Sequence, residues 1–265
     1  TGMPPYPMYT ANKLMWLRSY DPAVFNAAAR FLCMADFLFT RMGLPPTMDH
    51  SLASRTMLQD IRARAWDPDL LRLAGLDAER LSATVPSGTL LGEIAPHVAA
   101  DLGLAPGAVA VTGGHDHCCG SLGVGATRAG MMMDSTGTVE CVTAVMETLV
   151  LDDNLLRSNL PVEPHTVAGM YVVLGWSSVG GALLKWYRDT FARAEVAEAA
   201  RSGRSAYDVI LAEAVEGPSP VLILPHFVGS GTPELDPLSK GAILGLTLST
   251  TRGQIVKAII DSVTY

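Results

Sequence analysis

The chain has 265 residues, of which 49% are hydrophobic, and its 19 Lys and Arg face 26 Asp and Glu, giving a formal net charge of −7. This composition is that of a globular protein rather than a disordered one, and the acidic balance argues against a nucleic-acid-binding surface. No apolar run reaches the roughly 18 residues of a membrane span, the first nine residues lack the regions of a signal peptide, and four cysteines do not form a disulfide framework. We therefore expect a cytoplasmic protein without a membrane or nucleic-acid partner.

Helix signals dominate the first part of the chain. A short helix begins near Lys13, and Asp21-Pro22 reads as an N-cap followed by proline at the first helical position. The apolar spacing that follows predicts one helix over residues 24–42, ended by Gly43. A second Asp-Pro pair, Asp67-Pro68, predicts a helix stopped by Gly75, and a further helix is expected over residues 93–102.

Beyond residue 126, strands alternate with helices. Strands are expected at residues 131–134, 140–145, 167–173 and 221–224, and helices at residues 178–191, 196–200, 207–214 and 250–263. This change of pattern places a domain boundary at residue 126, with one domain over residues 1–125 and a second over residues 126–265.

Asp116 follows a predicted strand and a glycine turn at the centre of the chain. Residues 109–111 have strand character, Gly113-Gly114 predicts a tight turn, and a helix follows. Such a unit places a carboxylate at the carboxyl end of a sheet, where α/β proteins bind ligands. A carboxylate there can take the proton of an attacking hydroxyl, so Asp116 is a candidate general base. The alternative is an aspartate in a polar turn whose oxygens accept backbone N–H groups.

Metal-ligand residue types cluster around Asp116. His115, His117, Cys118 and Cys119 are nearly consecutive. Zinc ligands come in spaced pairs, and four adjacent residues on a regular element do not point at one ion. We therefore predict packing and hydrogen-bonding roles and no metal site.

Two glycine motifs are candidate phosphate sites. Gly137-Thr138 lies between two predicted strands, where the backbone N–H groups of a tight turn and a threonine hydroxyl can hold phosphate oxygens. Gly180-Gly181 precedes an apolar helix, whose N-terminus suits an anion. A plain hairpin turn and close helix packing are the alternatives.

Taken together, these motifs resemble those of the FGGY carbohydrate kinases. The family's carboxyl-terminal signature is matched by Gly241, Ile243, Gly245, Leu246, Gln254, Ile255, Ala258, Ile259, Ile260 and Asp261. Its amino-side signature is matched by Met8, Thr10, Lys13, Leu14, Trp16 and Leu17, and departs at Ser19 and Tyr20. Residues 49–60 with Trp66, residues 85–92 and the Gly-Gly-His-Asp block are also similar to family segments.

The resemblance implies two ribonuclease-H-like α/β domains of the actin-like ATPase superfamily, with the sugar on the first and ATP-Mg²⁺ between them. It places the catalytic base on Asp116 and nucleotide phosphates at Gly137, Thr138, Gly180 and Gly181. We expect Asp116 and His117 to bind the substrate. Members are about twice as long and carry an amino-terminal phosphate loop and an adenine-binding motif that this sequence lacks. We therefore expect a central fragment, with both domains incomplete, that is inactive alone.

Other functions stay open at this point. A catalytically silent sugar-binding or regulatory module with a kinase-like fold is the main alternative, and a metal-dependent hydrolase built on His115, Asp116 and His117 is another. The expected partner is a small sugar, ketose or polyol, which the sequence does not name, and a homodimer is allowed for.

Overall fold

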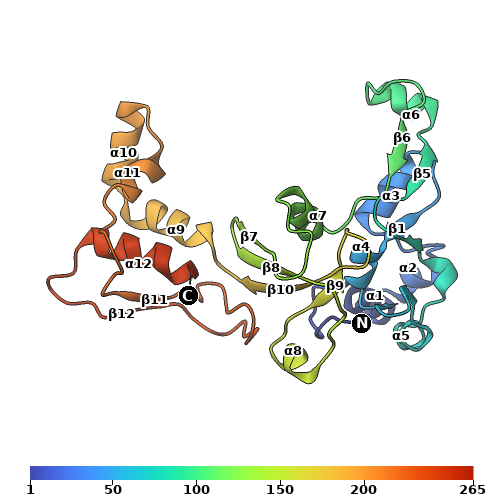
Figure 1. The fold of residues 1–265 in the computed structure, drawn as a ribbon, viewed down its shortest axis with the longest axis horizontal. Coiled ribbons are helices and arrows are strands. Elements are labelled where there is room, and N and C mark those ends of the chain that lie inside the picture. Colours follow the sequence, from blue (N-terminus) through green and yellow to red (C-terminus); the bar gives the residue numbers. More distant parts are fainter. Residues whose placement is uncertain (265) are drawn as a thin grey trace. The chain divides into compact units, whose positions relative to one another are not determined.

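The computed structural model describes residues 1–264 and consists of mixed helices and short strands (Figure 1). The elements up to the central helix are α1 (Thr10–Tyr20), α2 (Pro22–Ala27), α3 (Met34–Arg41), β1 (Thr47–Asp49), α4 (His50–Ser54), β2 (Gln59–Asp60), β3 (Ala65–Trp66), α5 (Pro68–Ala74), a 3₁₀ turn (Ala78–Arg80), β4 (Ala83–Val85), β5 (Leu90–Glu93), α6 (Pro96–Asp101), β6 (Val109–Val111) and α7 (Asp116–Gly123). Those that follow are β7 (Met132–Thr136), β8 (Glu140–Met146), α8 (Asp153–Arg157), β9 (Val162–Pro164), β10 (Tyr171–Ser177), α9 (Gly181–Phe191), α10 (Arg193–Ser202), α11 (Ala206–Leu211), β11 (Leu222–Leu224), β12 (Ala242–Leu244) and α12 (Arg252–Thr264).

The chain folds into two compact units. The first unit comprises Thr1–Met133 and Thr143–Leu174, and the second comprises Asp134–Val142 and the chain from Gly175 onward. The division passes through three strands of the four-stranded sheet, whose order is β7-β8-β10-β9. The other sheets are two-stranded: β1 pairs with β4 in parallel, and the pairs β2-β3, β5-β6 and β11-β12 are antiparallel.

Two separate apolar cores of the first unit are seen among residues 1–264. One lies between α1, α2, α5 and the segments around them, and its buried members are Ala11, Leu14, Phe25, Leu58, Leu71, Ala74, Leu76 and Leu81. The other is built from Leu44, Ile94, Ala99 and Ala110 and joins α6 to β6. The second core fixes the strand that leads into the Gly113-Gly114 turn.

The second unit is built around α9, α12 and β11. Their buried side chains form one cluster, which consists of Val179, Leu183, Tyr187, Ala192, Ile210, Val221, Ile223, Val256, Ala258 and Ile259. Leu183 and Tyr187 lie one turn apart on α9, as an amphipathic helix requires. This core carries the N-terminus of α9, and with it Gly180-Gly181.

The predicted helix over residues 24–42 is wrong, because two helices stand in its place. α2 ends at Ala27, the chain is extended at Ala28, and α3 begins only at Met34. The guanidinium of Arg80 donates hydrogen bonds to the carbonyl oxygens of Phe25 and Ala28, and the N–H of Phe31 donates to the Arg80 carbonyl at 2.8 Å. A residue remote in sequence therefore binds the backbone groups that a continuous helix would pair within itself.

Several other predicted bounds are shifted. The expected helix over residues 93–102 is α6 alone, since Glu93 ends β5 and Pro96 opens the helix. The strand expected at residues 167–173 begins later, at Tyr171. By contrast, Asp21 and Asp67 accept helix N–H groups at the starts of α2 and α5, as predicted. No helix within residues 1–264 has the length and apolarity that crossing a bilayer demands.

Candidate functional site

The turn between β6 and α7 is tight because of packing, and not because of an unusual backbone angle. Neither Gly113 nor Gly114 has a positive φ. A Cβ on Gly114 would lie 2.4 Å from Cγ2 of Thr166 and 2.9 Å from Oγ of Ser51, whereas a Cβ on Gly113 would meet nothing within 4 Å. The predicted strand, turn and helix are confirmed, but β6 pairs antiparallel with β5 instead of ending a parallel sheet.

A buried aspartate holds this turn in place. Asp49 is 2% exposed and caps α4, and its Oδ2 accepts hydrogen bonds from the hydroxyls of Ser51 at 2.6 Å and Ser87 at 2.8 Å. The Ser51 Oγ in turn accepts the backbone N–H of His115 at 2.8 Å. Asp49 is a supporting residue that the sequence reasoning did not single out, although an aspartate directly before a helix is a capping signal.

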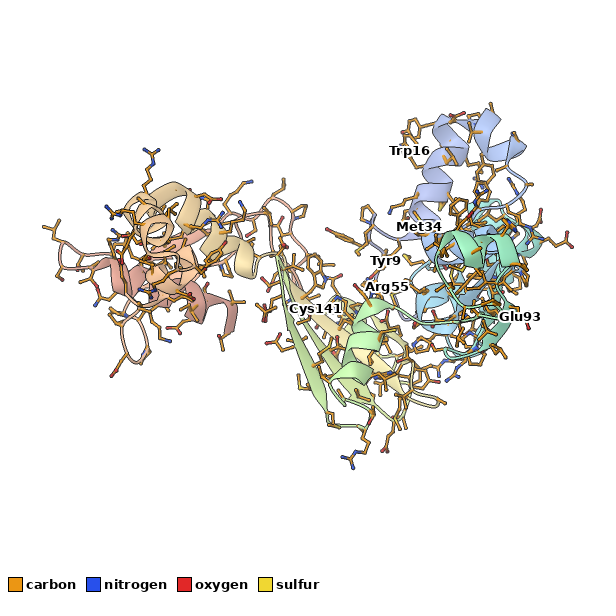
Figure 2. All side chains as sticks on the ribbon, turned by 90° about the horizontal axis from the view of Figure 1, so that it is seen from above. Tyr9, Trp16, Met34, Arg55, Glu93 and Cys141 are labelled. Carbon is orange, nitrogen blue, oxygen red and sulfur yellow. The ribbon has the colours of Figure 1, made fainter. Side chains whose placement is uncertain are left out.

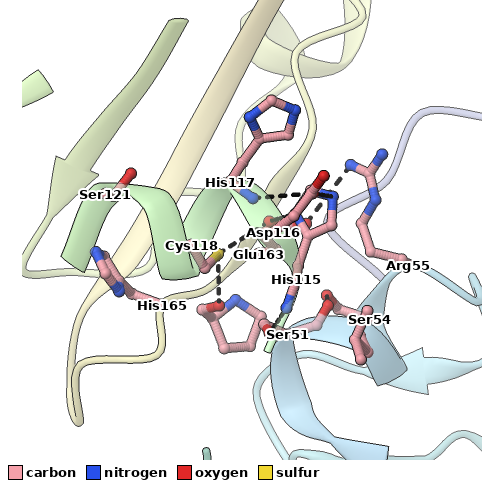
Figure 3. A network of polar contacts seen from close by, with 12 residues as sticks. Ser51, Ser54, Arg55, His115, Asp116, His117, Cys118, Ser121, Glu163 and His165 are labelled. Carbon is pink, nitrogen blue, oxygen red and sulfur yellow. Dashed lines mark hydrogen bonds and ion pairs between the residues drawn. The ribbon is translucent and has the colours of Figure 1, made fainter. Parts of the chain in front are cut away.

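Asp116 is the first residue of α7, and its side chain is 85% exposed. Its Oδ1 accepts the backbone N–H of His117 at 2.9 Å and lies 3.1 Å from Nε2 of His115. No hydrogen bond or ion pair from residues 1–264 engages Oδ2. The turn therefore satisfies one carboxylate oxygen and leaves the other open to solvent (Figure 3).

Behind His115 lies a buried carboxylate that sequence reasoning missed. Glu163, in β9, has a side chain with 0% exposure, and its Oε1 lies 2.6 Å from Nδ1 of His115. The thiol of Cys118 donates to the same oxygen at 3.1 Å, and Nη1 of Arg55 lies 3.5 Å from Oε2. Burial by itself would raise the pKa of Glu163, but the hydrogen bond and charge of His115, together with Arg55, hold that pKa below its usual range.

Arg55 supplies the permanent positive charge of this cluster. Its guanidinium carbon lies 5.2 Å from the centre of the Tyr9 ring, a cation–π contact that holds the side chain against Glu163 (Figure 2). No local signal in the sequence joins Arg55 and Glu163 to His115, because three separate segments supply them.

His115, Cys118 and Glu163 are also a group with metal-ligand chemistry, since their donor atoms lie within 4.8 Å of one another. Here Nδ1 and Sγ both bond to Oε1 of Glu163. Burial, and then the charge of Glu163, raise the pKa of the Cys118 thiol far above its ordinary value, so the group is a hydrogen-bond donor and not a thiolate. The arrangement is that of a hydrogen-bonded cluster.

His117 follows Asp116 in α7, and its ring lies beside that of His115. Its ring meets that of His115 edge-on, with 5.3 Å between the ring centres. Burial lowers the pKa of His117, so the ring is neutral at neutral pH. A neutral imidazole beside an open carboxylate oxygen can both donate and accept hydrogen bonds, as binding of a hydroxylated ligand requires.

His165 supports the same region from behind. It is 5% exposed, its Nε2 lies 3.1 Å from the Ala126 carbonyl oxygen, and its Nδ1 accepts the N–H of Val167 at 3.0 Å. These partners fix the neutral tautomer with the proton on Nε2, and burial lowers the pKa of His165.

The lowered pKa of His165 makes the free energy of unfolding depend on pH. The unfolded chain binds a proton at His165 near pH 6.5, whereas the folded chain binds it only at lower pH, so the free energy of unfolding should fall as pH drops below about 6.5. The slope is at most about 1.4 kcal/mol per pH unit for this group. Urea unfolding between pH 7.5 and 5.5 measures it. His165→Asn keeps an acceptor for Val167 and should flatten the slope, and an unchanged slope would contradict this role.

The four predicted phosphate-binding residues come together in the second unit. The N–H of Gly180 donates to the Thr138 carbonyl at 2.9 Å, that of Gly181 to the Gly137 carbonyl at 2.8 Å, and that of Ala182 to the Thr138 carbonyl at 3.3 Å. These amides are therefore already paired within the chain, and anion binding at Gly180-Gly181 stays a prediction.

Close packing also requires glycine at both positions. A Cβ on Gly180 would lie 2.9 Å from the Val139 carbonyl, and one on Gly181 would lie 2.9 Å from the Gly137 carbonyl oxygen. Thr138 is exposed at the tip of the β7–β8 turn, and its hydroxyl has no hydrogen-bond partner within residues 1–264. Any role of this turn in phosphate binding thus falls on Thr138 and stays a prediction.

Known proteins match the chain along its whole length. The model of the FGGY family of carbohydrate kinases, N-terminal domain, matches residues 1–123, and the C-terminal domain model of the same family matches residues 132–265. A gluconokinase of Bacillus subtilis is 28% identical over 100% of this chain and 52% of its own length. An autoinducer-2 kinase of Yersinia pestis is 32% identical over 75% of this chain and 37% of its own length.

Solved structures agree on the fold. A ligand-bound xylulose kinase of Lactobacillus acidophilus superposes with a TM-score of 0.85 at 22% identity, covering 99% of this chain and 51% of that one. This likeness confirms the predicted ribonuclease-H-like α/β class. The chain spans about half the length of the relatives it matches. Because the two family models together match nearly every residue, the chain belongs to the FGGY family of carbohydrate kinases.

Proposed function

We propose that the complete protein containing this chain transfers the γ-phosphoryl group of ATP to a hydroxyl of a sugar, ketose or polyol, with Asp116 as general base. The observation that carries the proposal is the state of the Asp116 carboxylate, which has Oδ1 tied and Oδ2 open at the start of α7. As the hydroxyl oxygen forms its bond to phosphorus and the bond to ADP breaks, Oδ2 takes the hydroxyl proton. The neutral imidazole of His117, the next residue in α7, would orient the same substrate by hydrogen bonding.

ATP would be held on the second unit, near Gly137, Thr138, Gly180 and Gly181. The amides of Gly180 and Gly181 donate to carbonyl oxygens of the β7–β8 turn and so keep this turn close to α9. Thr138 then contributes the hydroxyl that reaches a phosphate oxygen. Bound Mg²⁺ would neutralise phosphate charge during transfer.

The acceptor class follows from the family and not from one relative. The similar proteins are named for gluconate, autoinducer-2 and xylulose, so their names do not agree on one substrate. A panel of sugars, ketoses, sugar acids and polyols, read by ADP formation with the complete protein, tests the proposal. Sugar-dependent ADP formation is expected with at least one compound, and its absence across the panel favours a catalytically silent binding module.

The isolated 265 residues should turn over little or no ATP. This expectation rests on length, because the chain spans about half of the relatives it matches and would then supply only part of the ATP contacts. Calorimetry with the same panel distinguishes the alternative, in which the chain binds a sugar without ATP-dependent product. Measurable sugar-dependent ADP formation by these residues alone would overturn the prediction. The division into domains at residue 126, the cytoplasmic location and a homodimer stay predictions.

A further inference from the structure

We propose that His115, held by the buried Glu163, is a positioning residue that fixes Oδ1 of Asp116 and so presents Oδ2 to the acceptor hydroxyl. This inference rests on the proposed function, because it needs Asp116 to be the base. It assigns to His115 and Glu163, which are 48 positions apart in the chain, the role of orienting the Asp116 carboxylate.

The geometry is a continuous chain of three side chains. Oε1 of Glu163 lies 2.6 Å from Nδ1 of His115, and the opposite ring nitrogen, Nε2, lies 3.1 Å from Oδ1 of Asp116 (Figure 3). The exposed fraction of the side chain rises from 0% at Glu163 through 14% at His115 to 85% at Asp116. The imidazole thus connects a rigid, buried carboxylate to a solvent-facing one.

The imidazole makes a different kind of contact on each side. Its Nδ1 is hydrogen-bonded to Glu163, whereas the approach of Nε2 to Oδ1 of Asp116 is an ion-pair contact, which attracts the carboxylate when the ring carries a proton on both nitrogens. The charges then balance locally, since Glu163 and Asp116 face His115 and Arg55. This balance is why a fully buried Glu163 can stay ionised behind the site.

Without His115, Asp116 has little to hold it. It is the first residue of a helix, is mostly exposed, and would keep only the N–H of His117 as a partner for Oδ1. An exposed side chain populates several rotamers, and only those that point Oδ2 toward the acceptor are productive. A displacement of about 1 Å in such a site can cost on the order of 10²-fold in rate.

The test uses His115→Asn in the complete protein. Asparagine places an amide near the position of Nδ1, so Glu163 keeps a donor while the contact with Asp116 is lost. We expect kcat to fall about 10- to 100-fold, with the KM values for sugar and ATP changed less than about twofold. His97→Asn, which makes the same change at an exposed histidine on α6, is the control and should leave kcat unchanged.

A double-mutant cycle separates positioning from a merely structural role. In an Asp116→Asn background there is no base to orient, so His115→Asn should cause no further loss of kcat. Glu163→Gln removes the charge behind the ring and should also lower kcat only when Asp116 is present. Equal losses in both backgrounds, or a normal kcat for His115→Asn, would overturn the inference.

The outcomes also separate this inference from the function on which it rests. If Asp116→Asn collapses the rate and His115→Asn does not, the positioning role alone fails. If Asp116→Asn itself keeps a near-normal rate, or the complete protein forms no ADP with any sugar, both the general-base assignment and this inference fall. Melting temperatures of all variants, measured alongside, identify any loss that comes from unfolding.

Discussion

Asp116→Asn in the complete protein should lower kcat at least about 10²-fold, because general-base catalysis contributes roughly 10²–10⁴-fold. The amide cannot take a proton from the acceptor hydroxyl, whereas its oxygen still accepts the His117 N–H that Oδ1 accepts now. The fold and substrate binding should therefore survive. Steady-state ADP formation at saturating sugar and ATP measures the loss, which should appear in kcat more than in either KM.

The chain offers a matched control for this substitution. Asp153 is also the first residue of a helix, α8, and is also exposed. Asp153→Asn makes the same chemical change at the same helix position, so it reports any effect of removing a charge from a helix N-terminus. It should leave kcat unchanged, and a near-normal rate for Asp116→Asn would remove Asp116 from the role of base.

Gly114→Ala should impair both stability and activity. Its methyl group would lie 2.4 Å from Cγ2 of Thr166 and 2.9 Å from Oγ of Ser51. Overpacking of this kind typically costs about 1–3 kcal/mol in the free energy of unfolding. The strain falls on the turn that carries Asp116 and on the Ser51 hydroxyl that holds the His115 N–H, so kcat should drop on the order of 10-fold or more.

Two further variants, one a control and one a rescue, test whether the Gly114→Ala effect comes from packing. Gly113→Ala adds the same methyl group to the neighbouring glycine, where nothing lies within 4 Å, and should change neither quantity appreciably. Thr166→Ser removes the clashing Cγ2 and keeps the hydroxyl that donates to the Cys118 carbonyl, so it should partly rescue Gly114→Ala. Equal effects at Gly113 and Gly114, measured by urea unfolding and kcat, would contradict the packing explanation.

Local sequence signals predicted the elements that depend on neighbouring residues. The Asp-Pro starts of α2 and α5 are N-caps whose partners lie within three residues. The strand, turn and helix around Gly113-Gly114 were likewise readable, since apolar patterning and glycine act over a few positions. Where a remote residue intervened, the prediction failed: Arg80 binds the carbonyls of Phe25 and Ala28 and ends α2 where apolar spacing predicts a continuous helix.

The sequence by itself determined the family, the mixed α/β class and the carboxylate on which the proposed chemistry depends, because those rest on local motifs and their order along the chain. Only the tertiary structure decided what surrounds that carboxylate. It brought Glu163 from β9 to His115, left Oδ2 of Asp116 open, and engaged the amides of Gly180 and Gly181 with a neighbouring turn. Motifs record which residues are near in the chain, whereas hydrogen bonding and charge compensation depend on which segments pack together in the fold.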